Sequence, residues 1–367
     1  MVWSFASLGE VEIALFRAIA GELEERLGDL DLQGRTDAFL MLFAMRIRRA
    51  IWAFTFAGLP CGDLLIKARA AMRSIGQAIE VSKASPGVLM PPEGVLPSLG
   101  LPDEDRPRVL VDLPDRHVIL KPPGWQVDDD VLVSEARPLS EYLQTLNPMR
   151  HMPILTDVEH DRGFLHRLDV PSSGLVLAAK SYAAYYDLLL QLSAGDLVRD
   201  YVVLCHGWLP LARGEINARV YESKSGTSSA VSWRGRPSGT RLKVLAHAMC
   251  RGVTFSVVAI RIRTGRMHQI RVHTAHVAHP TVCDWKYTSV STMRADSKWC
   301  PRNFLHRHRL AFLDGDGCVL QATTPLPVDL DRTLRQLSAR DRYSAQEILR
   351  WLEDQGSKNW DDLHVLR

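Results

Sequence analysis

Apolar and polar positions follow two different patterns along this chain. In residues 1–85 the apolar residues recur at the spacing of a helix face. Beyond residue 107, short apolar runs such as Leu175–Ala179 and Phe255–Ile262 are typical of buried strands, and Met267–Ala278 has the pattern of a helix. We therefore expect an all-α helical region followed by a domain of the α+β class.

The boundary between the two patterns is rich in proline. Six prolines between residues 86 and 107 break any helical pattern, so we interpret this segment as a linker. The sequence then predicts four parts: a helical region over 1–85, a linker over 86–107, an α+β domain over 108–335, and a carboxy-terminal helical tail over 336–367.

The tail carries a start signal for a helix. Ser344 and Glu347 have the spacing of a capping box, and Ile348, Trp351 and Leu352 follow at helical spacing. We expect a short helix that begins at Ser344.

The helical region contains a weak internal repeat. The segment VWSFASLG at Val2–Gly9 is similar to IWAFTFAG at Ile51–Gly58, 49 residues later. Each copy predicts a helix pair led by a buried tryptophan. The pairs resemble the helical-repeat modules of organellar RNA-binding proteins, although solenoids generally need about three repeats or more to bury their faces. An extra helical hairpin packed on the following domain is the alternative.

Overall composition is that of a soluble globular protein, with 24% charged residues and a formal net charge of +3. The distribution of charge is more informative. Between Lys180 and Lys286 there are 15 Lys and Arg against 6 Asp and Glu. Such a local excess favours contact with RNA phosphates.

Cysteine spacing and the amino-terminal charge pattern bear on the cellular compartment of the protein. The six cysteines form no C-x-x-C pair, which fits a reducing environment. Arg46 and Arg48 interrupt the nearest candidate for a membrane helix. Glu10 and Glu12 precede the first basic residue, Arg17, so no targeting peptide is evident. We expect an intracellular protein, cytoplasmic or organellar, with no membrane partner.

The first polar motif is FLHRLDVPSSGLVLAAKS, at Phe164–Ser181. An Arg-Leu-Asp triplet that ends at Asp169 precedes a turn at Pro171–Gly174 and then a buried run. Asp169 therefore lies at the rigid edge of a strand and is a candidate for catalysis. The alternative is a structural ion pair.

A second polar motif, TGRMHQIRVHTAHVAHPTVCDWKY, lies at Thr264–Tyr287 and directly follows an apolar strand. Within it His273, His276, His279 and Cys283 recur at intervals of three, three and four residues, a spacing that could hold a metal ion. His279 precedes a proline, which has the pattern of a helix end. We expect no metal here.

Together the two motifs resemble the signatures of the RluA-type RNA pseudouridine synthases, HRLD-x-x-TSGLLL-x-AK and GRTHQIRVH. Three further segments resemble the family in the same order, HVILKPPGWQV at His117–Val127, VRDYVVLCHGWL at Val198–Leu209 and LHRHRLAFLD at Leu305–Asp314. The resemblance covers about residues 108–330. It implies a mainly antiparallel mixed sheet with an RNA cleft on one face, and an enzyme that isomerises uridine to pseudouridine without a cofactor or metal.

The resemblance also implies roles for individual residues. Asp169 matches the catalytic aspartate, Arg271 its counter-ion and Tyr201 the active-site tyrosine. A carboxylate in a pocket that excludes water needs such a cation to stay charged. Arg167 matches the arginine that helps displace the target base, and His166 orients the Arg-Leu-Asp turn. The expected substrate contacts are His166, Arg167, Arg266, His268, Gln269 and Ile270.

Four positions depart from the family pattern. Ser172 replaces Thr, Arg199 replaces Lys, Met267 replaces a small or hydroxyl residue, and Cys283 replaces Gly. Glycine often marks a backbone position with positive φ, so we expect a local rearrangement at Cys283.

Two other functions remain open at this point. One is a protein of the same fold that has lost catalysis and binds RNA through its basic cleft and helical repeat. In either case, with or without catalysis, we expect a monomer whose partner is ribosomal or transfer RNA. The other is a hydrolytic or metal-dependent enzyme, in which Asp284 could supply the second carboxylate that glycoside hydrolases usually need. The family pattern instead implies a structural Asp284.

Overall fold

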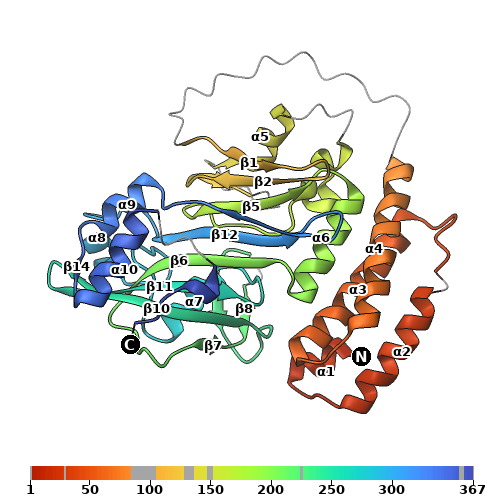
Figure 1. Ribbon diagram of the computed structural model, residues 1–367, viewed down its shortest axis with the longest axis horizontal. Coiled ribbons are helices and arrows are strands. Elements are labelled where there is room, and N and C mark those ends of the chain that lie inside the picture. Colours follow the sequence, from red (N-terminus) through yellow and green to blue (C-terminus); the bar gives the residue numbers. More distant parts are fainter. Residues whose placement is uncertain are drawn as a thin grey trace.

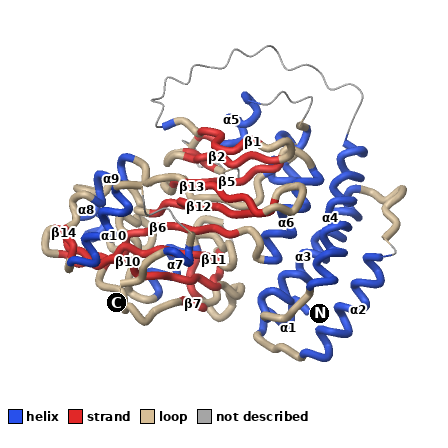
Figure 2. The backbone as a smooth tube through the Cα atoms, in the orientation of Figure 1, coloured by secondary structure: helices blue, strands red, loops and turns tan. Residues whose placement is uncertain are grey.

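The computed structural model describes residues 2–28, 30–83, 105–127, 136–146, 152–223, 226–354 and 359–366. Most of the segment predicted as a linker, 86–107, lies outside these residues. The fold combines amino-terminal helices with a large mixed sheet and several short helices (Figures 1 and 2), which confirms the α+β prediction.

Ten strands form the main sheet, in the order β1, β2, β5, β12, β6, β11, β10, β14, with β13 paired to β12 and β7 paired to β10. All of its pairs are antiparallel except β12 with β5. The strands are β1 (Arg108–Asp112), β2 (Arg116–Lys121), β5 (Ser173–Ala179), β6 (Val198–His206), β7 (Glu215–Asn217), β10 (Gly239–Cys250), β11 (Val253–Ile262), β12 (Leu305–Leu313), β13 (Val319–Thr323) and β14 (Ser338–Ala339). Two small sheets pair β3 (Trp125–Gln126) with β4 (Arg137–Pro138) and β8 (Val220–Glu222) with β9 (Ser229–Val231).

Helices gather at the two ends of this sheet (Figure 1). At one end lie α8 (Val290–Asp296), α9 (Val328–Leu334) and α10 (Arg342–Leu352). At the other end, α6 (Tyr182–Ala194) separates the sheet from α1 (Val2–Leu8), α2 (Ile13–Gly28), α3 (Asp37–Ala57) and α4 (Gly62–Lys83). The remaining helices are α5 (Leu139–Leu146) and α7 (Gln269–His276), with 3-10 turns at Pro153–Thr156, Val158–Gly163 and Trp360–Asp362.

The amino-terminal helices pack directly on α6. Gly76 of α4 lies so close to α6 that a Cβ atom there would be 2.5 Å from the Cα of Ala183. Polar contacts add to this interface, because Arg69 pairs with Asp196 at 3.0 Å and Lys83 pairs with Asp157 at 2.6 Å. The helices therefore cover an apolar face of the α+β domain, as the helical-hairpin alternative proposed.

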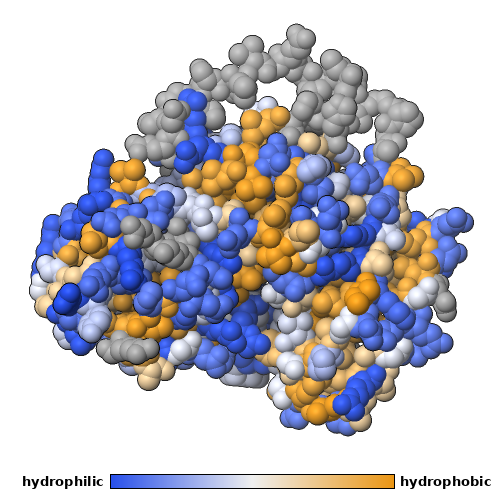
Figure 3. All heavy atoms as spheres, viewed as in Figure 1, coloured by the Kyte–Doolittle hydropathy of each residue, from blue (hydrophilic) through white to orange (hydrophobic). Residues whose placement is uncertain are grey.

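The internal repeat has a structural counterpart. Helix α2 begins at residue 13 and α4 at residue 62, which are 49 residues apart, the offset seen in the sequence. Each preceding helix ends before a glycine with positive φ, Gly9 at 83° and Gly58 at 70°. The expectation of a buried tryptophan is wrong for Trp3, which is 39% exposed and packs against Trp52. Trp52 is half-buried and packs against the core. Figure 3 shows apolar residues on the surface of these helices.

The carboxy-terminal region joins the main sheet through β14 and packs α10 on β10. The predicted start at Ser344 is wrong, since the helix begins at Arg342 and its N-cap is Asp341, which accepts a hydrogen bond from the Ser344 amide. The Ser344 hydroxyl instead accepts the His247 amide at 3.0 Å. In the described part of the chain, no helix combines the length and apolarity needed to span a bilayer.

Candidate active site

Arg271 connects two carboxylates in the centre of the site. It lies in the first turn of α7, and its side chain is buried. Its Nε and Nη2 donate to the two oxygens of Asp284, each at 2.7 Å, and its Nη1 donates to Asp169 at 2.7 Å. Because the bidentate pair with Asp284 fixes the plane of the guanidinium, the third donor is held in position toward Asp169.

Asp169 is the carboxylate that remains accessible. Burial alone would raise the pKa of this carboxyl. The neighbouring Arg271, His268 and Arg167 lower it by more than burial raises it, so the pKa of Asp169 lies below the ordinary value. Its side chain is 16% exposed and lines a cavity of about 420 Å³. The site therefore holds an ionised carboxylate open to a ligand.

Asp284 has a different position, because its side chain is fully buried. Besides Arg271, it accepts hydrogen bonds from the Thr281 hydroxyl at 3.2 Å and from the amides of Lys286 and Tyr287 at 3.0 and 3.2 Å. All of these contacts hold the loop that follows α7. Asp284 is thus an anchor for Arg271, as expected, and not a second carboxylate facing the cavity.

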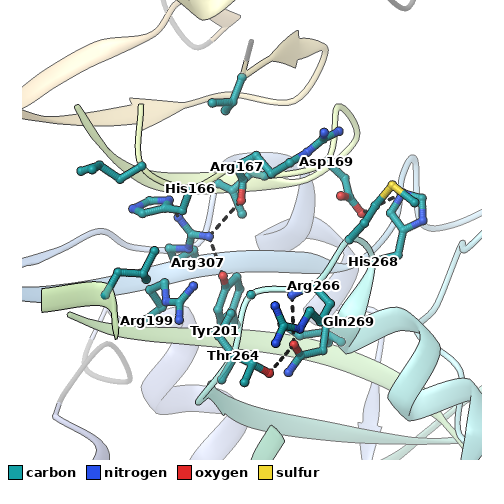
Figure 4. A pocket seen from close by; sticks show the side chains of 18 of the residues that line it. His166, Arg167, Asp169, Arg199, Tyr201, Thr264, Arg266, His268, Gln269 and Arg307 are labelled. Carbon is teal, nitrogen blue, oxygen red and sulfur yellow. Dashed lines mark hydrogen bonds and ion pairs between the residues drawn. The ribbon is translucent and has the colours of Figure 1, made fainter. Parts of the chain in front are cut away.

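Tyr201 comes from β6, and its hydroxyl accepts a hydrogen bond from Arg307 of β12 at 2.5 Å. The guanidinium of Arg307 also lies 4.9 Å from the centre of the Tyr201 ring (Figure 4). Arg307 was not among the site residues predicted from the sequence, although it lies in the LHRHRLAFLD segment. The available signal was a charged residue inside a segment whose apolar pattern predicts a buried strand.

The same arginine organises the Arg-Leu-Asp turn. Arg307 donates to Nδ1 of His166 at 2.7 Å and to the backbone oxygen of Arg167 at 3.1 Å. Burial, with the nearby Arg307, lowers the pKa of His166 well below its usual value, so this imidazole is neutral and accepts. His166 therefore helps to place the turn that carries Asp169, in agreement with its expected orienting role.

The second motif supplies both supporting and lining residues. Gln269 accepts hydrogen bonds from the Thr264 hydroxyl and the Arg266 amide, and donates to the Gly239 oxygen and the Thr240 hydroxyl. Its amide is thus occupied in joining α7 to β10. Ile270 is nearly buried and lines the cavity.

His268 stands beside Asp169 with an unusual backbone. Its φ is 54°, and its Nδ1 lies 2.8 Å from the Tyr287 hydroxyl. Burial lowers its pKa to about 4, and its Nε2 is 3.9 Å from Asp169. A neutral imidazole next to the carboxylate can donate or accept a hydrogen bond without adding charge.

The cavity is strongly basic. Seven arginines and two aspartates line it, and the arginines are Arg48, Arg167, Arg199, Arg263, Arg266, Arg271 and Arg307. Burial lowers the pKa of Arg199 and of Arg266 to about 10, which still leaves both charged at neutral pH. The arrangement favours an anionic ligand.

No cluster of three or more metal-ligating side chains occurs among the described residues. The candidate ligands are otherwise engaged, since His273 contacts the Thr240 hydroxyl at 2.9 Å and the Ala218 oxygen at 3.0 Å, and His279 contacts the His206 oxygen at 2.8 Å. Each of these two histidines therefore contacts a protein oxygen through a ring nitrogen.

Cys283 keeps the backbone conformation that glycine favours. Its φ is 56°, and its amide donates to Asp296 at 2.8 Å. The side chain lies beside Met293, and the turn into Asp284 has a left-handed residue at this position.

Comparison with known proteins agrees with the geometry. Residues 117–276 match the family model described as RNA pseudouridylate synthase. This segment of the chain is therefore similar to RNA pseudouridylate synthases. The amino-terminal helices lie outside the segment that matches this family.

The chain is similar to bacterial proteins of this family. It is 36% identical over 187 residues to "Ribosomal large subunit pseudouridine synthase D" of Buchnera aphidicola subsp. Acyrthosiphon pisum, which covers 48% of this chain and 58% of that protein. A protein of the same name from Xanthomonas campestris pv. campestris is 33% identical over 198 residues, with 51% and 58% covered. The chain therefore spans less than two thirds of these relatives.

A solved structure shares the fold. "Human RNA Pseudouridylate Synthase Domain Containing 1" superposes with a TM-score of 0.50 at 23% identity, and covers 68% of this chain and 97% of its own. The likeness supports the observed arrangement of strands.

Proposed function

We propose that this protein isomerises uridine to pseudouridine in RNA. The observation that carries the proposal is the contact between Asp169 and Arg271, in which a buried guanidinium, fixed by Asp284, keeps an accessible carboxylate ionised inside a basic cavity. A protein that only binds RNA has no need for an anion in its binding cavity, because that anion repels phosphate. The match of residues 117–276 to the RNA pseudouridylate synthase model also supports catalysis.

The reaction breaks the bond from C1′ to N1 of uridine and joins C1′ to C5 of the same base. The proton lost from C5 balances the one gained at N1, so no redox partner or cofactor is required. Asp169 acts as a nucleophile on the sugar or base, or removes a proton from the ribose. In both cases the ionised form is the active one, which is the form that Arg271 favours.

The remaining residues of the site bind and orient the target nucleotide. The base must leave its stack to reach Asp169, at a cost of a few kcal/mol. Tyr201 offers a ring for the extruded uracil, and the hydrogen bond from Arg307 fixes the direction of its hydroxyl. Arg167 follows His166 at the mouth of the turn and is suited to take the place of the extruded base.

Ribosomal RNA is the substrate class to test first, since the similar bacterial proteins carry large-subunit names. Purified protein is incubated with ribosomal and transfer RNA from cells that lack the gene, and pseudouridines are then mapped. We expect new pseudouridine with the wild-type protein and none with Asp169→Asn, which keeps the side-chain shape and removes the charge. Absence of pseudouridine with the wild-type protein on both RNAs would contradict the proposal.

A further inference from the structure

The cavity that contains Asp169 has a wall outside the family domain. Arg48 and Trp52 of α3 line it, together with Leu192 and Ser193 of α6 and with the Arg-Leu-Asp segment. The family match starts at residue 117, so these two α3 residues belong to the helices that are added to this chain. The fold places α3 on α6, so residues of both helices form this part of the cavity wall.

Arg48 is a cation without a partner in the described part of the chain. Its Nε is buried and makes no hydrogen bond, and no described residue forms an ion pair with its guanidinium. Asp161, which lines the same cavity, accepts a hydrogen bond from Tyr185 at 2.9 Å, and its charge acts on Arg48 without a hydrogen bond between them. Burial lowers the pKa of Arg48, as is usual for a cation that lacks a counter-ion. A half-buried arginine in this state is stabilised by an anionic ligand.

Trp52 gives the same end of the cavity a rigid aromatic wall. Its ring stacks on Phe56 with centroids 4.7 Å apart, and Trp3 packs against it with centroids 6.4 Å apart. Arg49 lies 5.9 Å from the Trp3 ring. An aromatic ring beside an unpaired guanidinium is the combination that proteins use to bind a base and its phosphate in single-stranded nucleic acid.

We propose that this end of the cavity is a second nucleotide subsite, in which Arg48 binds a phosphodiester next to the target uridine and Trp52 contacts the neighbouring nucleotide. The inference rests on the proposed function for its ligand, RNA. The cavity of about 420 Å³ is partly open to solvent, and a base must be unstacked and unpaired to contact Trp52 inside it. The added helices then select uridines whose flanking strand is unpaired.

Binding to a labelled single strand of about 12 uridines, within the usual site size of such grooves, tests the subsite without catalysis. We expect Arg48→Met to weaken binding about tenfold, the effect of losing one charge-assisted hydrogen bond. The slope of log affinity against log salt should fall by about 0.7, as for one phosphate contact. Arg46→Met is the matched control, because Arg46 is an exposed arginine of the same helix, and it should change affinity less than twofold.

Three further measurements separate the outcomes. Trp52→Leu should weaken binding to the single strand and leave the salt slope unchanged, and a duplex of the same length should bind all variants equally. If Arg48→Met lowers the melting temperature of the protein, the binding assay is repeated with Arg48→Lys and Arg48→Gln. Of these two variants, only Arg48→Lys should keep the wild-type salt slope. Equal affinity and slope for the Arg48 and Arg46 variants would overturn the subsite. Wild-type protein that binds the strand through Arg48 and forms no pseudouridine would contradict the proposed function alone.

Discussion

Arg307 on β12 donates a hydrogen bond of 2.5 Å to the hydroxyl of Tyr201 on β6, and the same guanidinium holds His166 and the backbone of Arg167. One buried cation thus joins Tyr201 to the turn that carries Asp169. Replacing it affects both parts of the site at once.

We expect Arg307→Met to lower kcat by at least about tenfold and to destabilise the fold by about 1–3 kcal/mol, because the Tyr201 hydroxyl and the His166 ring lose a buried partner. Tyr201→Phe should lower kcat as well. If the two residues act as one unit, the double variant should lose less than the sum of the two single losses in free energy. Strict additivity in kcat and in urea unfolding would show that they act independently.

Arg271→Met should move activity toward higher pH. Arg271 lowers the pKa of Asp169, so its loss raises that pKa, and the carboxylate then ionises only at higher pH. The acid limb of the kcat/KM profile should shift upward in the Met variant and partly return in Arg271→Lys, which keeps charge but not the bidentate fork. An unchanged acid limb would assign the role of counter-ion to another cation, such as Arg167.

The same pair should make stability depend on pH. The depressed pKa of Asp169 contributes stability above the pKa of an unfolded aspartate, about 3.9, and this contribution is lost as pH falls through the folded value. In Asp169→Asn, the free energy of unfolding should therefore decrease less than in the wild type as pH is lowered from 5 toward 3. Urea unfolding at several pH values measures both curves, and parallel curves would contradict this expectation.

Gly76→Ala should weaken the packing of α4 on α6. A Cβ atom at this position would lie 2.5 Å from the Cα of Ala183, so the two helices must move apart. We expect a loss of about 1–3 kcal/mol in thermal or urea unfolding. Gly21→Ala in α2 is the control, since nothing lies within 4 Å of its added Cβ and alanine favours a helix by about 1 kcal/mol. If the two substitutions change the free energy of unfolding equally, the close contact between α4 and α6 at Gly76 is contradicted.

Deletion of residues 1–83 should lower solubility. Helix α6 is buried on nearly all sides, and α3 and α4 cover its outer face, so their removal exposes Tyr182 and Ala183, which lie against Gly76, to water. Sedimentation and dye binding by the truncated protein measure this exposure. A monomeric, soluble truncated protein that folds with the same melting temperature would show that the amino-terminal helices are dispensable for the fold.

The sequence determined the features that depend on local pattern and motif. Short apolar runs and helical periods predicted the α+β class, and the resemblance carried by the HRLD and QIRVH motifs predicted that Asp169 and Arg271 would meet across 102 residues of chain. The offset of 49 residues also anticipated the two equivalent helix starts. These features follow from short-range periodicity and from motif chemistry, which are written in consecutive residues.

Only the tertiary structure decided which polar groups share a partner. It assigned Asp284 to the buried side of Arg271, and Arg307 to Tyr201, because strands and loops distant in sequence approach one another in the sheet. It also moved the N-cap of α10 from Ser344 to Asp341, since the Ser344 hydroxyl accepts a hydrogen bond from β10. Finally, it brought Arg48 of α3 into the cavity of Asp169, a juxtaposition that depends on how α3 packs on α6 and has no signature in the local sequence.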